Sequence, residues 1–393
     1  MFLFSNKQCK KLLHVALNKR FVFILFILIA VATAWKQYVH GTYNNYLIFK
    51  YVFEHSLRGV DLYAEYPDEY FDSNHYGPIF ALIVAPFALL PNAIGMVLWN
   101  IVNVIVLWLG IYSLPLHDKN KALVALTCSH EILTSLLSFQ FNVGLTGLIL
   151  LSFSWIEKQQ EFKSALMIVV GTLVKLYGIV GLAFFFFCKN KVRFIVSGLF
   201  LLLVLPLTSA LITDMKYTVF AYQDWYHSLV FKNSQNVTLG SMQDISLMGI
   251  VRRISRNPTL PNTPFLLGGL ILFVLPYLRV QQYKFKAFKL MLLSSVLIFT
   301  VIFSSGSESP TYIIAMIGVA LWFFIQPSSR KAWVPSLFVF ALLLTSFSPS
   351  DLFPRYLREN YIIPYSLKAL PCVLIWFVIT YQMMTVNFED YSD

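Results

Sequence analysis

Charge is what this sequence has least of. Charged residues make up 12% of its 393 residues, and apolar residues make up 58%. A soluble domain carries about 25% charged and about 45–50% apolar residues, so the composition excludes an ordinary water-soluble domain. The net charge of +11 does not indicate nucleic-acid binding, because cytoplasmic loops of membrane proteins are themselves rich in Lys and Arg.

Cysteine is also scarce. The four cysteines are Cys9, Cys128, Cys188 and Cys372, and none of them lies in a long polar segment. No pair has the spacing of metal ligands. The pattern therefore excludes a disulfide-stapled fold and a cysteine metal site.

What the sequence does have is a series of continuous apolar runs of about 15–25 residues, the length needed to cross about 30 Å of hydrocarbon. The runs do not alternate apolar with polar residues, which excludes a membrane β-barrel. We therefore expect an all-α polytopic membrane protein with about twelve transmembrane helices. The predicted spans lie near residues 21–35, 78–90, 94–114, 121–138, 143–156 and 164–187, then in a seventh run that ends at about 212, and near 264–278, 288–302, 311–325, 333–347 and 367–384.

Charge also predicts the sidedness and the division of the chain. Lys7, Lys10, Lys11, Lys19 and Arg20 precede the first run, which places the N-terminus in the cytoplasm and both long polar segments outside. We expect three parts: a module of about seven spans over residues 1–212, a second external loop over 213–262, and about five further spans over 263–393. The first external loop is predicted at residues 36–78.

The first polar loop concentrates acids in a chain that has few. It begins with an apolar stretch that reads as an interfacial helix capped by Asn44 and Asn45 and ended by Gly59. A carboxylate here can act as a base or bind a sugar, and Asp61 and Asp72 are the best placed. His75 and Tyr76 stand before the second predicted span as candidate substrate-binding residues. The alternative is a solvated acidic loop with aromatic anchors. The acids are Glu54, Asp61, Glu65, Asp68, Glu69 and Asp72.

Several polar residues interrupt the apolar runs. Glu131 and Lys175 are costly inside a bilayer, so they either pair with each other or line a cavity. Lys175 is a candidate for binding a lipid phosphate. Gln140 and Asn142 bind substrate in one interpretation and join helices in the other.

Two candidates lie further along the chain. Arg252, in an amphipathic stretch over 245–254, suits phosphate oxygens, or faces anionic lipid. Glu308 reaches an external cavity, or belongs to the start of the helix opened by Ser309 and Pro310.

A series of short motifs occurs in order along most of the chain, and it resembles glycosyltransferase family 87, integral membrane enzymes of the GT-C type. A Bacteroidetes-type branch is indicated by Asn44-Asn45-Tyr46-Leu47-Ile48-Phe49, Glu308-Ser309-Pro310-Thr311 and Leu370-Pro371-Cys372. The family motifs are Gly59-Val60-Asp61-Leu62-Tyr63, Tyr76-Gly77-Pro78-Ile79-Phe80-Ala81-Leu82, Pro86-Phe87-Ala88-Leu89-Leu90-Pro91, Leu98-Trp99-Asn100, Gln140-Phe141-Asn142, Lys175, and Ser246-Leu247-Met248-Gly249 with Arg252.

The resemblance implies a GT-C-like fold with two long external loops. It implies transfer of a sugar, typically mannose, from a polyprenyl-phosphate donor to a glycan or lipid acceptor. Such an enzyme of the cell envelope would lie in the bacterial inner membrane with its active site facing outside. Asp61 or Asp72 would be the base of an inverting attack, with Lys175 and Arg252 neutralising the phosphate. The resemblance fixes no cofactor, and a divalent cation stays open.

The chain departs from the family at one point. Where the family often has an Asp-Phe pair early in the first loop, this chain has Asn44 and Asn45, and asparagine cannot act as a base. Two other functions stay open. Twelve spans with Glu131 and Lys175 inside them would suit a transporter or flippase of a lipid-linked or polar solute, and the departure at Asn44 and Asn45 favours a non-catalytic scaffold. A transporter predicts functional residues near the bilayer midplane, whereas a transferase predicts them under the first loop.

Overall fold

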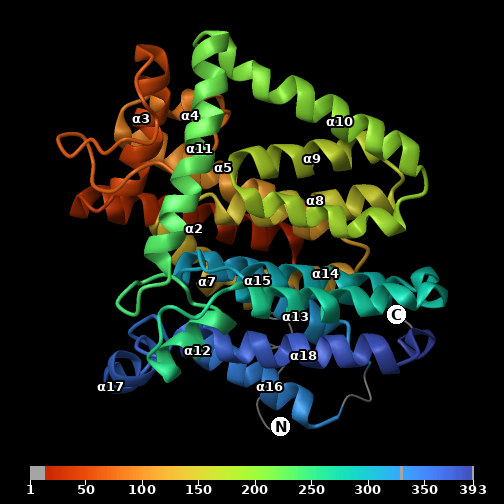
Figure 1. Ribbon diagram of the computed structural model, residues 1–393. Coiled ribbons are helices and arrows are strands. Elements are labelled where there is room, and N and C mark those ends of the chain that lie inside the picture. Colours follow the sequence, from red (N-terminus) through yellow and green to blue (C-terminus); the bar gives the residue numbers. More distant parts are fainter. Residues whose placement is uncertain (1–13, 328–330, 392–393) are drawn as a thin grey trace.

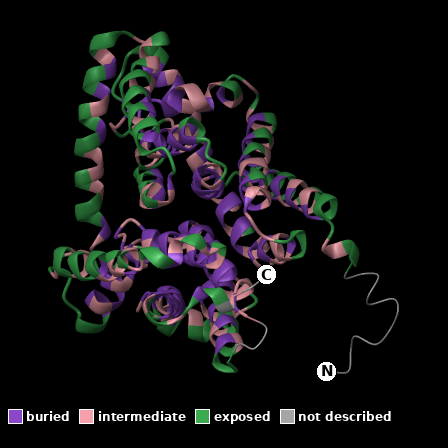
Figure 2. Ribbon diagram, turned by 90° about the vertical axis from the view of Figure 1, so that its right-hand side faces the viewer, coloured by how far each residue is buried: buried purple, intermediate pink, exposed green. Residues whose placement is uncertain are grey.

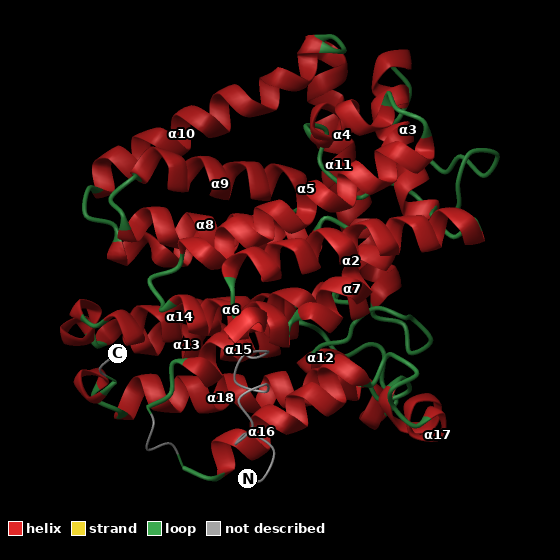
Figure 3. Cartoon of the chain, turned by 180° about the vertical axis from the view of Figure 1, so that it is seen from behind, coloured by secondary structure: helices red, strands yellow, loops and turns green. Residues whose placement is uncertain are grey.

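The computed structural model describes residues 14–327 and 331–391, and every regular element in these ranges is helical. Most helices lie side by side with their axes roughly aligned, as Figures 1 and 3 show. They form an N-terminal group that ends with α10 (Lys191–Leu207) and a C-terminal group that begins with α13 (Thr263–Val274). The long helix α11 (Met215–Asn236) crosses one end of the bundle from the first group to the second (Figure 1).

Hydrogen bonds between neighbouring helices hold the N-terminal group together. Parallel helices α5 and α8 are linked at both ends, by Gly144 N donating to Asn103 Oδ1 at 3.0 Å and by Ser113 Oγ and Ser154 Oγ at 2.7 Å. The elements are α2 (Lys19–His40), α3 (Asn44–Arg58), α4 (Phe80–Ala88), α5 (Asn92–Ser113), α6 (Asp118–Thr127), α7 (Ser129–Leu137), α8 (Asn142–Glu157), α9 (Glu161–Val174), η1 (Leu176–Phe187), α10 and η2 (Thr208–Leu211).

The C-terminal group continues from α12 (Leu247–Ser255), which lies below α11 in Figure 1. It meets the first group at the end away from α11, where the Lys289 ammonium lies 2.9 Å from both Glu157 carboxylate oxygens. Its elements are α13, η3 (Leu275–Leu278), η4 (Val280–Lys284), α14 (Lys286–Ile302), η5 (Ser309–Thr311), α15 (Tyr312–Phe324), α16 (Trp333–Ala341), η6 (Leu342–Phe347), α17 (Arg355–Leu357), η7 (Arg358–Ile362), η8 (Leu367–Ala369), α18 (Leu370–Thr385) and η9 (Phe388–Asp390).

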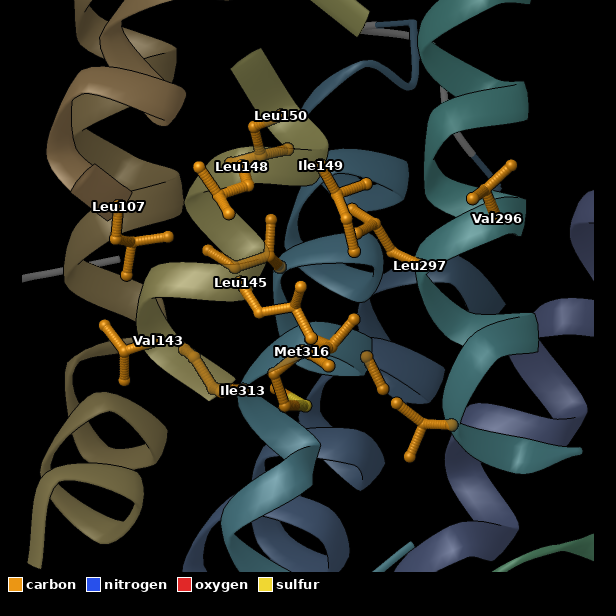
Figure 4. Packing of buried hydrophobic residues seen from close by; sticks show 14 of the residues in the cluster. Leu107, Val143, Leu145, Leu148, Ile149, Leu150, Val296, Leu297, Ile313 and Met316 are labelled. Atoms are coloured by element: carbon orange, nitrogen blue, oxygen red, sulfur yellow. The ribbon is translucent and has the colours of Figure 1, made fainter. Parts of the chain in front are cut away.

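The core lies where the two groups meet. Figure 4 shows side chains of α5 and α8 packed towards those of α14 and α15, among them Leu107, Leu145, Leu297 and Met316. Close packing of α5 on α8 depends on small residues, because a Cβ added at Gly147 would lie 2.5 Å from the Val106 carbonyl. Buried residues gather where helices meet, and exposed residues follow the outward faces (Figure 2).

Four helices in the described ranges are long and apolar enough to cross a membrane. They are Lys19–His40, Asn92–Ser113, Lys191–Leu211 and Leu367–Thr385, and five apolar helices are shorter, at 10–17 residues. The all-helical membrane fold predicted from composition is confirmed at this level, whereas the count of about twelve spans stays a prediction. Lys7, Lys10 and Lys11, on which the predicted sidedness partly rests, lie outside the described residues.

Two predicted spans are wrong in detail. The span predicted at 164–187 is a tight hairpin: α9 ends at Val174, Lys175 adopts an extended backbone, and η1 runs back along α9. The two segments touch at Gly171 and Gly178, where a Cβ on Gly178 would lie 2.2 Å from the Gly171 carbonyl carbon. The span predicted at 78–90 is the nine-residue α4, about 13 Å long and too short to cross a bilayer.

The two long polar segments are more ordered than loops. The predicted helix of the first is α3, and Gly59 ends it in the left-handed conformation, φ 68°. Its N-cap is Tyr43, so the predicted capping by Asn44 and Asn45 is wrong. Most of the second segment is helical, in α11 and α12.

Candidate active site

A cavity of about 370 Å³ opens at the end of the bundle that α11 crosses, called the loop end below. It lies between the first polar loop, the turn at Lys175, helix α11 and the connection from α14 to η5. Of the nine residues proposed from sequence, six line it: Asp72, His75, Tyr76, Gln140, Lys175 and Glu308. Segments more than 200 residues apart in the sequence therefore meet in one hollow.

Asp72 enters the cavity from a constrained stretch of the first loop. Its backbone is left-handed, φ 75°, a conformation that costs free energy in a non-glycine residue and is common at functional sites. Asn44 holds the preceding residue from both sides, because its amide donates to Phe71 O at 2.7 Å and accepts from Phe71 N at 2.8 Å. The asparagine that replaces the family's usual acid thus positions the neighbour of another acid.

The Asp72 carboxylate lies beside two basic groups. The Lys232 ammonium approaches its two oxygens at 3.1 and 3.2 Å, and His75 Nε2 lies 3.9 Å away. Burial, together with the positive charges of Lys232 and Lys175, lowers the pKa of His75 to about 4 against the opposing effect of Asp72. The imidazole is therefore neutral at pH 7, and its Nδ1 lies 3.0 Å from Ser228 Oγ.

Lys175 reaches the cavity from the apex of the α9–η1 hairpin. Its ammonium donates to Asn142 Oδ1 at 2.8 Å, Asn142 donates to Gln140 Oε1 at 2.7 Å, and Gln140 donates to Glu308 Oε1 at 2.7 Å. This series of bonds, called the amide relay below, connects the cavity's lysine to a carboxylate without direct contact. Asn142 itself is fully buried and does not line the cavity.

Glu308 also starts a helix. Its side chain accepts from the backbone of Thr311, and the Thr311 hydroxyl contacts the backbone N–H of Glu308, which makes a capping box for η5. Both interpretations of this residue given by the sequence therefore hold at once: it caps the helix and it lines the cavity.

Helix α11 supplies a wall that sequence patterns did not predict. Trp225 Nε1 donates to His75 O at 3.0 Å, and Lys232, Asn233 and Asn236 line the cavity. With Leu229, which also lines the cavity, Trp225, Lys232 and Asn236 recur every three or four positions, the period of one helix face. The sequence does not reveal this inward face, because the outward face of the same helix also carries polar and aromatic residues.

Asp61, Arg252 and the amide of Asn142 lie away from the cavity surface. The Asp61 side chain accepts from Tyr63 N at 2.8 Å within an exposed turn. Arg252 is buried, where it donates to Asp244 Oδ2 at 2.6 Å, to Leu260 O and to Asn262. Burial raises the pKa of Asp244, while the hydrogen bonds from Ser246 and Arg252 oppose that rise.

The suggested pairing of Glu131 with Lys175 is wrong. Glu131 in α7 is fully buried and accepts from the Lys368 ammonium at 3.1 and 3.3 Å. Lys368 also donates to the hydroxyl and the carbonyl of Ser309, at 2.9 and 3.2 Å. This ion pair lies directly behind Glu308 and fixes the start of η5.

No group of three or more His, Cys, Asp or Glu side chains within residues 14–327 and 331–391 is arranged to hold a metal ion. The cavity's four charged side chains are two acids, Asp72 and Glu308, and two lysines, Lys175 and Lys232. A site with this balance can bind an anionic group at the lysines and accept a proton at a carboxylate.

The sequence profile of glycosyltransferase family 87 matches residues 74–305, more than half of the chain. The chain belongs to glycosyltransferase family 87. This confirms the family predicted from the motifs, and with it the assignment as a membrane glycosyltransferase. No curated protein matches the chain.

The matched segment of this family 87 glycosyltransferase contains most of the residues that line the cavity, although α3, which also lines it, lies outside the match. It contains His75, Gln140, Lys175 and Lys232, whereas Asp72 and Glu308 lie just beyond its two ends. The family match and the cavity therefore largely coincide along the chain.

Proposed function

We propose that this glycosyltransferase moves a sugar, mannose in this proposal, from a polyprenyl-phosphate donor to an acceptor hydroxyl in the cavity at the loop end. The observation that carries the proposal is that the first polar loop, Lys175 and Glu308 line one cavity at the end of the bundle. A transferase working on a lipid-borne donor needs its charged groups there, under the external loop.

The chain's course supports a membrane-spanning arrangement of about twelve passages. The passages between the two ends are α2, α5, α6 with α7, α8, α9, η1, α10, α13, α14, α15, α16 with η6, and α18. The hairpin at Lys175 adds one passage to the predicted set, and the short α4 removes one. A bilayer normal along these helices would place the cavity at one membrane surface.

The distribution of basic residues supports a non-cytoplasmic cavity. The connections at the end opposite the cavity are short and rich in Lys and Arg, as cytoplasmic loops are. The loop end carries most of the chain's acids. The basic residues at the opposite end include Lys19, Arg20, Lys119, Lys121, Lys158, Lys163, Lys189, Lys191, Arg193, Arg279, Lys284, Lys286 and Lys289.

In the proposed reaction, the acceptor hydroxyl attacks the anomeric carbon of the donor sugar with inversion. The new bond joins the acceptor oxygen to that carbon, and the bond from the carbon to the phosphate oxygen breaks. Asp72 takes the proton of the hydroxyl, and the polyprenyl phosphate leaves with the electron pair of the broken bond. Lys175 and Lys232, which face the cavity, stabilise the negative charge that develops on the phosphate.

Asp72 is preferred to Asp61 as the base because a base must come within hydrogen-bond reach of the proton it takes. Asp72 lines the cavity, whereas Asp61 does not. Arg252, which already bonds Asp244, leaves the phosphate to the two lysines in this proposal.

The test is a transfer assay with the purified chain and labelled polyprenyl-phosphate mannose. Asp72→Asn should lower turnover by about 100-fold or more, while Asp61→Asn, the matched control in the same loop, keeps it. Full activity in the Asp72→Asn variant would refute the assignment of the base. Movement of the labelled lipid across vesicle membranes without any transfer would favour the flippase.

A further inference from the structure

The cavity wall formed by α11 and the segment after it carries amide groups that have no partner. Asn236 is 6% exposed, lines the cavity, and its side chain finds no hydrogen-bond partner among the described residues. The residue lines the cavity, so a ligand there can reach the donors and the acceptor that the protein leaves unused. Its surroundings therefore point to a ligand that supplies the missing bonds.

Two neighbouring amides extend this wall. Asn233 accepts from Ser305 Oγ at 2.5 Å, which leaves its amide nitrogen free of partners within the described chain. Gln243 is held by its backbone, which accepts from Arg253 and donates to Ser241, while its side chain also lines the cavity without a partner among described residues. These three side chains are uncharged, and they offer both donors and acceptors.

We propose that Asn236, with Asn233 and Gln243, forms the subsite that binds the ring hydroxyls of the donor sugar and so selects a neutral hexose. This inference rests on the proposed function, since it assumes a donor whose phosphate lies at the lysines. An amide can donate to one hydroxyl and accept from another. A charged sugar would instead need an opposite charge beside its ring, and the side chains placed there, Asn236, Asn233 and Gln243, are uncharged.

The spacing along α11 favours the donor sugar over the acceptor. Lys232 and Asn236 are four residues apart on one helix, so their Cβ atoms lie about 6 Å apart on the same face. A phosphate at the Lys232 ammonium would hold the attached sugar ring next to the Asn236 amide. The acceptor would then approach from the side of Asp72, which Lys232 also contacts.

The experiment compares donors whose sugars differ in the configuration of one or two hydroxyls or in a carboxylate at C6. Purified full-length enzyme is given polyprenyl-phosphate mannose and the corresponding glucose, galactose and glucuronate donors, and kcat/KM is measured for each. Asn236→Ala should lower kcat/KM for the preferred neutral donor by about tenfold, with much less effect on its poorer epimers. The preference among epimers therefore shrinks. The control is Gln235→Ala, the adjacent exposed amide that does not line the cavity.

The outcomes separate this inference from the proposed function. Wild-type enzyme that transfers nothing from any polyprenyl-phosphate donor refutes the proposed function. Wild-type enzyme that transfers sugar, while Asn236→Ala keeps the full preference among epimers, refutes the subsite alone. A preference for glucuronate over every neutral sugar refutes it as well. If Asn236→Ala does not fold, Gln243→Ala decides by the same comparison.

Discussion

Two turns at the loop end each carry a lysine that points into the protein. The two lysines differ in how many hydrogen bonds their ammonium groups make to other protein groups. At the turn before α18, the Lys368 ammonium contacts Glu131 and both oxygens of Ser309, all within 3.3 Å. At the turn between α9 and η1, the Lys175 ammonium has one hydrogen bond in the described structure, to Asn142. An ammonium has three donors.

The difference separates a structural lysine from a binding one. Lys368 lies among protein groups and is 3% exposed, so a ligand has no donor left to meet. Lys175 faces the cavity with donors to spare, and the rings of Tyr76 and Tyr177 lie 5.7 and 5.3 Å from its ammonium. An intramembrane charge is therefore better interpreted from its unfilled bonds than from its position in an apolar run.

The largest effect is expected from replacing Lys368, the lysine whose ammonium is surrounded by protein partners. Lys368→Met leaves the Glu131 carboxylate buried without its partner, which costs about 3–5 kcal/mol of folding free energy. The thermal midpoint of the detergent-solubilised protein should fall sharply. The double variant Glu131→Gln with Lys368→Met should recover much of the loss, because no buried charge remains. A single variant as stable as the wild type would contradict the role given to this pair.

Replacing Lys175, which makes one hydrogen bond to the protein, should affect activity and leave stability nearly unchanged. Lys175→Met removes a donor that the protein itself barely uses, so stability changes little, whereas transfer falls by about 100-fold to 1,000-fold if the lysine stabilises the leaving phosphate. The measurements are single-turnover transfer and the thermal midpoint of the same sample. Lys289→Met, at the far end of the bundle beside Glu157, serves as the control and should keep its activity. Loss of stability without loss of transfer in Lys175→Met would reverse the comparison.

The contrast between the two lysines could be predicted only in part from the sequence. The apolar runs identified a helical membrane fold, and the motifs identified the family, because both depend on local patterns. The partner of Glu131 lies 237 residues further along the chain, beyond the reach of any local pattern. The hairpin at Lys175 was missed because α9 and η1 together have the length and hydropathy of one span, and only the contact between Gly171 and Gly178 shows the reversal.

The residues that line the cavity could also be predicted only in part from the sequence. Asp72, His75 and Glu308 stood out in the sequence as polar residues at the ends of apolar runs. Lys232 and Asn236 did not, because they lie in a polar helix where nothing distinguishes the inward face. Arg252 was proposed as a phosphate ligand on its residue type, and the structure gives its guanidinium Asp244 and Leu260 as partners.

The neutral His75 gives a pH-dependent test of the cavity's positive side. Its pKa is lowered from 6.5 to about 4, so the unfolded chain binds a proton more readily between these values. Stability should therefore fall as the pH drops from about 6.5 towards about 4, by roughly 2–3 kcal/mol from this group. His75→Gln should lose this part of the pH dependence in thermal unfolding curves. Identical curves for both proteins would show that burial and the two lysines do not lower the pKa of the imidazole.

The smallest effect is expected from breaking the amide relay, the series of hydrogen bonds that joins Lys175 to Glu308 through Asn142 and Gln140. Gln140→Leu removes the donor to Glu308 and the acceptor for Asn142, so Asn142 and Lys175 lose their fixed orientation while the lysine keeps its charge. Loss of one such hydrogen bond costs about 1.4 kcal/mol, so kcat should fall about tenfold. The KM for the donor lipid should change less, because the charge that attracts the phosphate stays. Gln235→Leu, on the exposed face of α11, is the control. A rise in KM with unchanged kcat would instead make the relay a part of donor binding, and Lys175 a charge that needs no orientation.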